Sequence, residues 1–226
     1  MTARRVCALI AARNEADRIG ATVSALRSLP GVEDVVVVDD ASTDGTASAA
    51  LAAGAAVIQG RCRAGKGRAL EGALRRLPPA GVWLLADADL GHTAGQLGAV
   101  LSEVLEGRAD LAVAILPPAQ GGGFGLVKRS AGRAIRLLSG FQPVEPLSGQ
   151  RALTHEALEA CRPLSAGFGV ETGMTIDAVR RGFRVVEVRA DLDHRATGRG
   201  LGGFAHRGRQ GVDVVLAVLP RALGLR

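Results

Sequence analysis

Aromatic residues make up only 3% of this 226-residue sequence, and tyrosine is absent. Proteins bind single-stranded nucleic acids largely by stacking bases on aromatic rings. Because the sequence supplies few such rings, we do not expect nucleic acid as a partner.

Cysteine is equally scarce: Cys7, Cys62 and Cys161 are far apart and form no CxxC pair. They predict neither a disulfide framework nor a thiolate metal site, and they fit a reducing cytoplasm. No apolar run approaches the roughly 18 residues that a membrane-spanning helix needs. The opening stretch MTARRVCALIAARNE has too few apolar residues for a signal peptide. We therefore expect a cytoplasmic protein.

Lysine occurs only at Lys66 and Lys128, so the net charge of +6 comes almost entirely from arginine. Arginine makes planar, two-pronged contacts with phosphate and carboxylate groups. The charge therefore favours anionic partners without naming one. The content of 47% hydrophobic and 22% charged residues is ordinary for a soluble globular protein, and the length suits one domain.

Short apolar runs alternate with helical segments over the first half of the chain. Continuous runs of this kind are typical of parallel strands that are buried on both faces. The expected strands are Val6–Ala11, Val35–Val38, Ala55–Ile58, Val82–Leu85 and Leu111–Ile115. The expected helices between them cover approximately residues 15–28, 43–53, 66–76 and 93–105. This alternation predicts a doubly wound α/β sheet with right-handed crossovers.

The pattern changes after about residue 117, where a glycine-rich segment begins. Beyond it we expect a strand near SGQRAL and another at Phe183–Val188. The helices expected in this half lie near residues 126–139, 154–161, 170–181 and 204–219.

Polar clusters follow four of the expected strands, at the edge where open α/β sheets bind ligands. The first, AARNE, lacks the GxGxxG of a dinucleotide site, which argues against a dehydrogenase. The second strand ends in Asp39 and Asp40, and the fourth in Asp87 and Asp89. Carboxylates after an apolar strand need a positive partner. After the third strand, RCRAGKG places glycines and a lysine at a helix start, which suits a diphosphate.

Together these segments resemble the family 2 nucleotide-sugar glycosyltransferases of the GT-A fold. AARNEADRI is similar to the family's P-A-x-N-E-E element, with Ala11 in place of the proline, and VVVDDASTDGT to its uridine-site element. GKGRAL and the D-x-D of DAD also match, as do LSGQRA, GFGVETG and DHRATGR farther along. The resemblance implies a Rossmann-like, mostly parallel sheet with helices on both faces and a smaller acceptor-side subregion. It also implies one domain, with a nucleotide-sugar-binding half over 1–116 and an acceptor-side half over 117–226.

The resemblance implies transfer of a hexose from a nucleoside diphosphate sugar with Mg²⁺ or Mn²⁺ as cofactor. Asp89 and His194 are then the metal ligands, and the metal offsets the charge that builds on the leaving diphosphate. Asp87 would lie nearer the ribose or a metal-bound water. Glu15 and Asp40 would hold ribose and base by charge-assisted hydrogen bonds. Asp40 favours UDP, although the N–H of guanine offers GDP a similar donor.

Lys66 would pair with the diphosphate, and the expected acceptor-side residues include Glu171. Glu171 could act as a base, but a phosphate acceptor needs none, and then it would position the donor sugar. The expected catalytic residues are Glu171, Asp87 and Arg151. The expected substrate-binding residues are Ala11, Ala12, Asn14, Glu15, Asp40, Ser42, Lys66, Gly67, Asp87, Ser148, Gly149, Arg195 and Arg199.

Two branches of the family look closest, one that makes glucosyl-3-phosphoglycerate or mannosyl analogues and one that makes polyprenyl-phosphate sugars. Arg151, Arg195 and Arg199 could grip the anionic acceptor of either branch. The acceptor and the retaining or inverting outcome stay open. Whether the protein forms a homodimer also stays open.

The last expected helix carries an apolar stripe that includes Val212, Val215, Leu216 and Leu219. Such a stripe most often packs on the core. It could also contact an anionic membrane, at the inner face, beside the basic residues that precede it. The glycine-rich residues 121–125 could close over the donor.

Other function classes fit less well. A sugar-phosphate nucleotidyltransferase would carry a G-x-G-T/S-R loop after the first strand, which is missing. A phosphatase would need a hydroxyl residue that DADLG lacks. A non-catalytic nucleotide-sugar-binding protein is the remaining alternative, but Asp87, Asp89, Lys66 and Glu171 are all present, which argues against decay.

Overall fold

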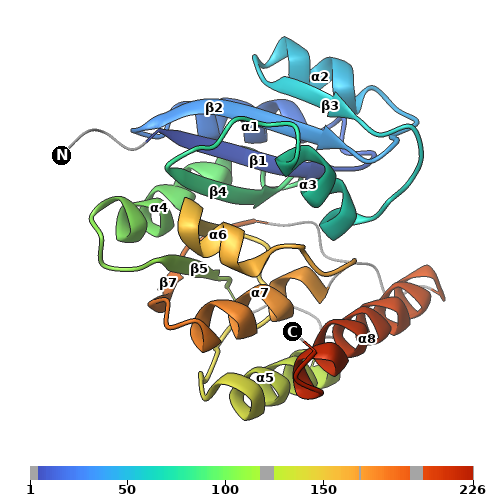
Figure 1. The fold of residues 1–226 in the computed structure, drawn as a ribbon. Coiled ribbons are helices and arrows are strands. Elements are labelled where there is room, and N and C mark those ends of the chain that lie inside the picture. Colours follow the sequence, from blue (N-terminus) through green and yellow to red (C-terminus); the bar gives the residue numbers. More distant parts are fainter. Residues whose placement is uncertain (1–4, 118–124, 168, 194–200, 226) are drawn as a thin grey trace.

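The computed structural model describes residues 5–117, 125–167, 169–193 and 201–225, and for residues 126 and 201–211 it describes the backbone only. Strands and helices alternate along the chain (Figure 1). The strands are β1 (Val6–Ala12), β2 (Val32–Asp39), β3 (Ala56–Gln59), β4 (Val82–Asp87), β5 (Leu111–Ile115), β6 (Arg151–Thr154) and β7 (Val185–Arg189). The helices are α1 (Ile19–Arg27), α2 (Thr46–Ala52), α3 (Lys66–Leu74), the 3₁₀ helix η1 (Gly91–Leu97), α4 (Gly98–Leu105), α5 (Gly125–Ser139), α6 (His155–Cys161), α7 (Gly169–Arg180) and α8 (Leu201–Ala222).

The strands form one seven-stranded sheet in the order β3-β2-β1-β4-β6-β5-β7. Pairing is parallel between β2 and its neighbours β1 and β3, between β1 and β4, and between β5 and β7. Strand β6 is antiparallel to both of its neighbours, β4 and β5. The expectation of a mostly parallel sheet is therefore confirmed, with β6 as the reversed strand.

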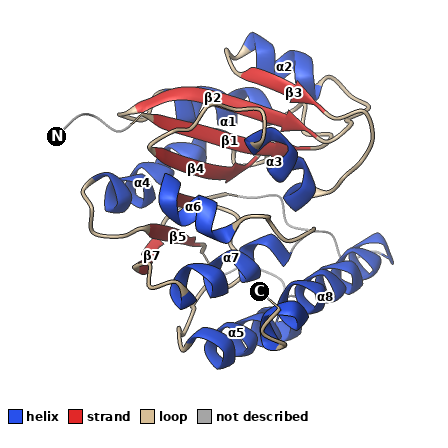
Figure 2. Cartoon of the chain, in the orientation of Figure 1, coloured by secondary structure: helices blue, strands red, loops and turns tan. Residues whose placement is uncertain are grey.

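Helices cover both faces of the sheet, as expected (Figure 2). Alternate residues of β1 enter different clusters: Ala8 and Ile10 pack with α1 and α4, while Cys7 and Leu9 pack with α3 and α7. Successive side chains of a strand point to opposite faces. Because both faces are covered, the whole of β1 is apolar, and this explains why its sequence showed no alternation.

Some helix boundaries differ from those expected. The helix expected at residues 15–28 begins only at Ile19, because Glu15 to Arg18 form the turn that leaves β1. The helix expected at 93–105 is split into η1 and α4. No side chain caps the junction between them.

Helix α8 packs on α7 and α5 through a narrow buried face (Figure 1). Val214 and Ala217 are 4% exposed, and Arg221 is 2% exposed. Arg221 forms an ion pair with Asp177 of α7, in which Nε lies 2.7 Å from Oδ1. An ion pair this deeply buried is costly to break from one side. Arg221 and Asp177 therefore fix α8 on α7.

The apolar stripe of α8 faces away from the core, so the expectation that it packs inward is wrong. The packing positions are instead filled by Val214, Ala217 and Arg221. The exposed stripe residues are 52–60% accessible: Val212, Val215, Leu216 and Leu219. Within the described helices, none is long and apolar enough to cross a membrane.

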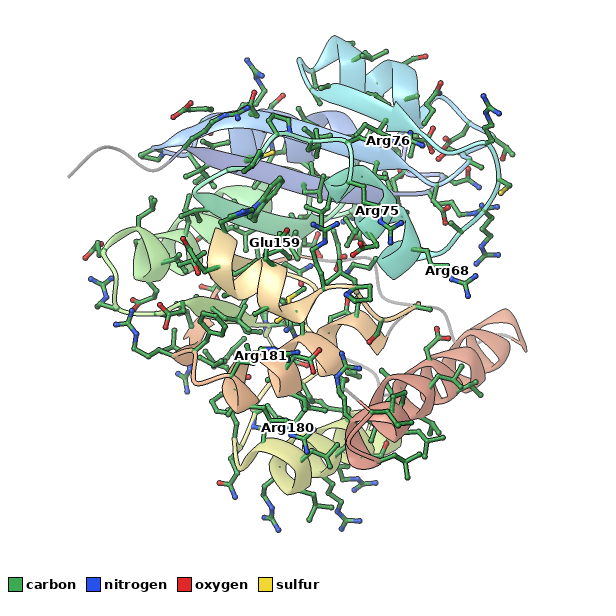
Figure 3. All side chains as sticks on the ribbon, in the orientation of Figure 1. Arg68, Arg75, Arg76, Glu159, Arg180 and Arg181 are labelled. Atoms are coloured by element: carbon green, nitrogen blue, oxygen red, sulfur yellow. The ribbon has the colours of Figure 1, made fainter. Side chains whose placement is uncertain are left out.

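Exposed arginines account for much of the basic charge. Arg68 projects from α3 and Arg75 and Arg76 follow directly after that helix, while Arg180 ends α7 and Arg181 follows it (Figure 3). Their exposure is ordinary for arginine and does not mark a site.

Candidate active site

The carboxyl ends of three neighbouring strands meet at one edge of the sheet. Ala11 pairs with Asp87 of β4, and Ala12 pairs with Asp39 of β2. This register brings the segment after β1 beside both acidic strand ends, as parallel pairing requires. The sequence segments AARNE, DDAS and DAD therefore belong to one site.

The turns after β1 and β2 hold each other in place. The backbone N–H of Asn14 donates to Ser42 Oγ at 3.0 Å, and the N–H of Thr43 donates to Asn14 Oδ1 at 2.8 Å. Asn14 has a left-handed backbone with φ 54°, a conformation that asparagine tolerates better than most residues. The N–H of Glu15 donates to Thr46 Oγ1 at 2.9 Å. Asn14 and Ser42 thus shape this rim of the site.

Asp40 organises the loop that leads into α3. Its carboxylate accepts hydrogen bonds from the N–H of Ala64 at 2.6 Å and of Gly65 at 2.9 Å. The residue is 7% exposed. The sequence suggested contact with a base for Asp40, and the structure adds a second task, which is holding the backbone immediately before Lys66.

Lys66 lies between two carboxylates from different parts of the chain. Its Nζ lies 2.6 Å from Asp87 Oδ1 at the end of β4 and 2.8 Å from Glu171 Oε1 in the first turn of α7. The Glu171 side chain is 5% exposed, whereas that of Asp87 is 36% exposed. Burial disfavours the ammonium, but attraction to Asp87 and Glu171 outweighs it and raises the pKa of Lys66. Lys66 is therefore charged, and its ion pairs link the end of β4 in the first half of the chain to α7 in the second half.

Gln150 is a member of this cluster that the sequence did not indicate. Its Nε2 donates to Asp87 Oδ2 at 2.7 Å, and its Oε1 lies 3.1 Å from Ser148 Oγ. Gln150 and Ser148 are each 1% exposed. A signal existed in the segment SGQRA, where a polar residue directly precedes a strand beside the site. The partner of that residue depends on the antiparallel register of β6, which the sequence does not show.

Two glycines of the expected site allow close packing. A Cβ on Gly149 would lie 2.9 Å from both carboxylate oxygens of Asp87 and would overlap Lys66 Nζ. A Cβ on Gly67 would overlap the carbonyl oxygen of Ser165. Gly149 therefore makes room for the Lys66–Asp87 pair, and Gly67 lets α3 touch the loop before α7.

Arg151 lies beneath the site rather than at its surface. It is 1% exposed, its Nε donates to Ser148 O at 2.8 Å, and its Nη1 donates to Thr175 Oγ1 at 2.9 Å. Its Nη2 is buried, and no described residue makes a hydrogen bond to it. Burial lowers the pKa of Arg151, and Glu171 opposes that shift. In this conformation Arg151 supports the loop at Ser148 and does not present its guanidinium to an acceptor.

Asp89 lies in the turn after β4, close to a distant part of the chain. Arg18 Nη1 donates to the carbonyl oxygen of Asp89 at 2.9 Å and lies 3.5 Å from the carboxylate of Asp193. The N–H of Asp193 donates to Thr93 Oγ1 at 3.0 Å. The chain therefore returns to the D-x-D turn at Asp193. His194, Arg195 and Arg199 lie outside the described residues, as do residues 121–124 of the glycine-rich segment.

Glu71 fixes the loop between α6 and α7 to α3. Its carboxylate accepts from Arg162 Nη2 at 3.0 Å, from the N–H of Leu164 at 3.1 Å and from Arg75 Nε at 3.2 Å. Burial would raise the pKa of Glu71, but these hydrogen bonds together lower it. The loop that leads to Glu171 is therefore attached to the helix that carries Lys66.

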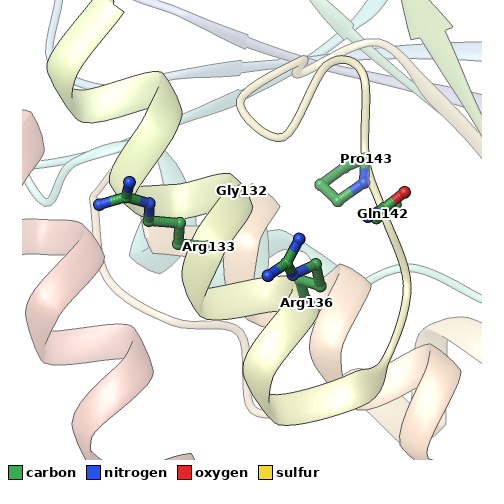
Figure 4. Close-up of a pocket in the computed structure, with 5 residues that line it drawn as sticks. All are labelled: Gly132, Arg133, Arg136, Gln142 and Pro143. Carbon is green, nitrogen blue, oxygen red and sulfur yellow. The ribbon is translucent and has the colours of Figure 1, made fainter.

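The described residues contain no group of three or more His, Cys, Asp or Glu side chains placed to hold a metal ion. Asp89 nevertheless offers a hard oxygen donor at the edge where the acidic strand ends meet, and such donors suit Mg²⁺ and Mn²⁺. A cavity of about 330 Å³ lies elsewhere, lined by Gly132, Arg133 and Arg136 of α5 with Gln142 and Pro143 (Figure 4). None of its lining residues belongs to the expected site.

A model of the family described as Glycosyl transferase family 2 matches residues 7–165. The chain belongs to this family. The match covers every expected donor-side residue, from Ala11 to Asp89, and ends before Glu171.

Two curated family relatives align with most of the chain. Glycosyltransferase AglJ of Haloferax volcanii is 32% identical over 187 residues, which cover 81% of this chain and 61% of AglJ. Glucosyl-3-phosphoglycerate synthase of Mycolicibacterium smegmatis is 30% identical over 202 residues, covering 79% of this chain and 65% of the synthase. The chain thus spans less than two thirds of the length of either relative.

Solved structures of glucosyl-3-phosphoglycerate synthase from Mycobacterium tuberculosis share the fold. One, in complex with Mg²⁺ and UDP, has a TM-score of 0.82 and 27% identity, covering 96% of this chain and 79% of that chain. Another, with Mn²⁺, UDP-glucose and glycerol 3-phosphate, has a TM-score of 0.80 and 26% identity, covering 96% of this chain and 80% of that chain. The expectation of a GT-A fold is confirmed.

Proposed function

We propose that this family 2 protein is a metal-dependent glycosyltransferase that moves a hexose from a nucleoside diphosphate sugar to an anionic acceptor. The observation that carries the proposal is the position of Lys66 between Asp87 and Glu171, at the edge where three strands end. An ammonium has three N–H groups, and the two carboxylates engage two of them. The third can meet a donor phosphate while the carboxylates hold the lysine in place.

We assign the metal to Asp89 and His194. Support comes from Asp193, whose N–H donates to Thr93 just after the D-x-D turn. His194 therefore directly follows a residue that is anchored at that turn. When bound, a divalent metal neutralises the charge that develops on the leaving diphosphate. Asp87, oriented by Lys66 and Gln150, faces the ribose or a metal-bound water.

UDP is the proposed nucleotide in preference to GDP. The Mycobacterium tuberculosis structures contain UDP or UDP-glucose with Mg²⁺ or Mn²⁺. In this chain, Asn14, Ser42 and Asp40 shape the corresponding rim, with Ala11, Ala12 and Glu15 beside them. A carboxylate has about four lone-pair positions. Asp40 uses two of these positions to accept from the backbone N–H groups of Ala64 and Gly65, so it can still accept the N–H of a base.

The proposed acceptor is a phosphorylated small molecule such as a phosphoglycerate, with a polyprenyl phosphate as the alternative. One Mycobacterium tuberculosis structure contains phosphoglyceric acid. A phosphate or hydroxyl of the acceptor would approach from the α7 side, where Glu171 lies in the first turn of the helix. We assign Arg195 and Arg199, which follow Asp193, to the grip on its negative charge.

We also propose a single cytoplasmic domain over residues 1–226 that associates through the stripe of α8. The stripe exposes four large apolar residues, and apolar patches of this kind mark contact surfaces. An anionic membrane and a second copy of the chain are the two partners to compare. Vesicle co-sedimentation measures membrane binding, and light scattering measures self-association. The partner is the one whose signal the wild-type protein gives and Leu216→Asp loses.

The experiment that tests the function is thermal unfolding with UDP-sugars and GDP-sugars, with and without Mn²⁺. A ligand at 100 times its dissociation constant adds about 2.7 kcal/mol to the stability of the folded state. Stabilisation that requires both nucleotide and metal is the expected result. A product assay that compares 3-phosphoglycerate with a polyprenyl phosphate then identifies the acceptor. No stabilisation by any nucleotide would refute the proposal.

A further inference from the structure

We propose that Gln150 is a positioning residue that holds Asp87 in the orientation needed to bind the donor and its metal. This inference rests on the proposed function. It assigns a role to a side chain that stands outside the set expected from the sequence.

The position of Gln150 follows from the reversed strand. Leu85 of β4 pairs with Arg151 of β6 in antiparallel register. Continuing that register by two residues places Gly149 opposite Asp87, and the absence of a side chain at Gly149 leaves room for Lys66 Nζ against the carboxylate. The carbonyl oxygen of Gln150 accepts from the N–H of Ala114 at 2.9 Å, which ties its backbone to β5. Gln150 is therefore anchored before its side chain turns to Asp87.

The direction of the Gln150 amide follows from its two polar contacts. Ser148 Oγ lies 3.1 Å from Oε1 and can donate to it, while Nε2 lies 2.7 Å from Asp87 Oδ2. The reverse orientation would place an amide oxygen against a carboxylate oxygen, with no proton between them. Both Gln150 and Ser148 are 1% exposed, so the amide and the hydroxyl are shielded from solvent.

Asp87 is consequently held at both oxygens. Lys66 binds Oδ1 at 2.6 Å and Gln150 binds Oδ2 at 2.7 Å. The two donors differ in charge, and that difference matters. Lys66 brings a positive charge to the Asp87 carboxylate, whereas the neutral amide of Gln150 fixes the geometry of that carboxylate without adding charge.

The test compares Gln150→Met, which keeps the length of the side chain and removes the donor, with the wild-type protein. Asp87 is assigned to the ribose or a metal-bound water rather than to the metal itself, and outer-shell partners of a metal site typically change metal affinity by about 10- to 100-fold when they are replaced. We expect a loss in that range for Mn²⁺ binding in the presence of UDP, measured by electron paramagnetic resonance. Ser148→Ala, which removes only the orienting hydroxyl, should give a smaller loss in the same direction. Gln142→Met, an exposed glutamine on another surface, is the matched control.

A double variant separates positioning from general structural support. If Gln150 acts through Asp87, then Gln150→Met in an Asp87→Ala background should change Mn²⁺ and UDP affinity by less than about twofold, because the carboxylate to be oriented is gone. Equal losses in both backgrounds would overturn the inference, as would Gln150→Met binding that matches the wild type while its unfolding temperature falls. Failure of the wild-type protein to bind UDP with Mn²⁺ would instead remove the proposed function, and this inference with it.

Discussion

The ammonium of Lys66 lies 2.8 Å from Glu171 Oε1, which links the start of α3 to the first turn of α7. Glu171 is almost fully buried, so removal of the lysine leaves an unbalanced carboxylate. Breaking a buried ion pair from one side costs on the order of 3 kcal/mol. We expect Lys66→Met to lower the free energy of unfolding by about that amount, measured by urea denaturation, and to abolish stabilisation by UDP.

The double variant Lys66→Met with Glu171→Gln separates the two effects of Lys66. Replacing both charges removes the unpaired carboxylate, so much of the lost stability should return. Binding of UDP should not return, because the positive charge is still missing. Recovery of UDP affinity in the double variant would contradict a direct role for Lys66 at the diphosphate.

Removal of the metal should have the same effect on nucleotide binding as loss of Asp89. With EDTA, UDP should give no thermal shift, and Mn²⁺ should restore it in the wild-type protein. Asp89→Ala should show no Mn²⁺-dependent shift at any concentration tested. Asp193→Ala is the control, since its carboxylate is exposed and its backbone N–H, which binds Thr93, is retained. A metal-dependent shift that persists in Asp89→Ala would show that other residues hold the ion.

The buried pair of Asp177 and Arg221 should contribute strongly to the docking of α8. We expect Asp177→Asn and Arg221→Met each to cost about 3–5 kcal/mol of unfolding free energy, because each removes one partner of a buried ion pair. Arg181 also lies 3.6 Å from Asp177, but its side chain is 40% exposed. Arg181→Met should therefore cost less than about 1 kcal/mol. Similar losses for Arg181→Met and Arg221→Met would contradict this account.

The stability that Glu71 contributes should depend on pH with a defined sign. The pKa of Glu71 is lowered from its ordinary value of 4.5 in the folded protein. Its hydrogen bonds therefore stabilise the fold above that ordinary value, and the stabilisation is lost as pH falls through the lower folded-state pKa. Glu71→Gln should destabilise the protein at neutral pH and do so less at about pH 3. Glu159→Gln is the control, because Glu159 pairs with the same Arg162 from a 45% exposed position.

Much of the sheet could be predicted because burial on both faces leaves a direct trace in the sequence. The expected strands at Val82–Leu85 and Leu111–Ile115 lie within β4 and β5, and the acidic residues after β2 and β4 meet as the topology rule requires. The reversed pairing of β6 was not predictable, since four residues between a loop and a helix do not specify their neighbours.

The errors at the site have a common physical origin. Gln150 was not predicted to be at the site, and Arg151 was predicted to reach the acceptor. Neighbouring residues in an extended segment point to opposite sides, and the pairing register decides whether residue 150 or residue 151 meets Asp87. Burial of Arg151 runs against the usual exposure of arginine. The exposed stripe of α8 arises similarly, because a buried ion pair occupies the packing face that apolar residues would ordinarily fill.

The insertion of β6 between β4 and β5 also affects how the chain can be synthesised. In the described chain, β5 joins the sheet through β6 and β7 and does not pair with β4. A ribosome completes β4 at Asp87 long before it reaches Arg151, so the nascent chain carries an unpaired strand edge for on the order of seconds. Open edges invite pairing with other chains. The interval before β6 emerges is therefore when the open edge of β4 is most exposed to pairing with strands of other chains.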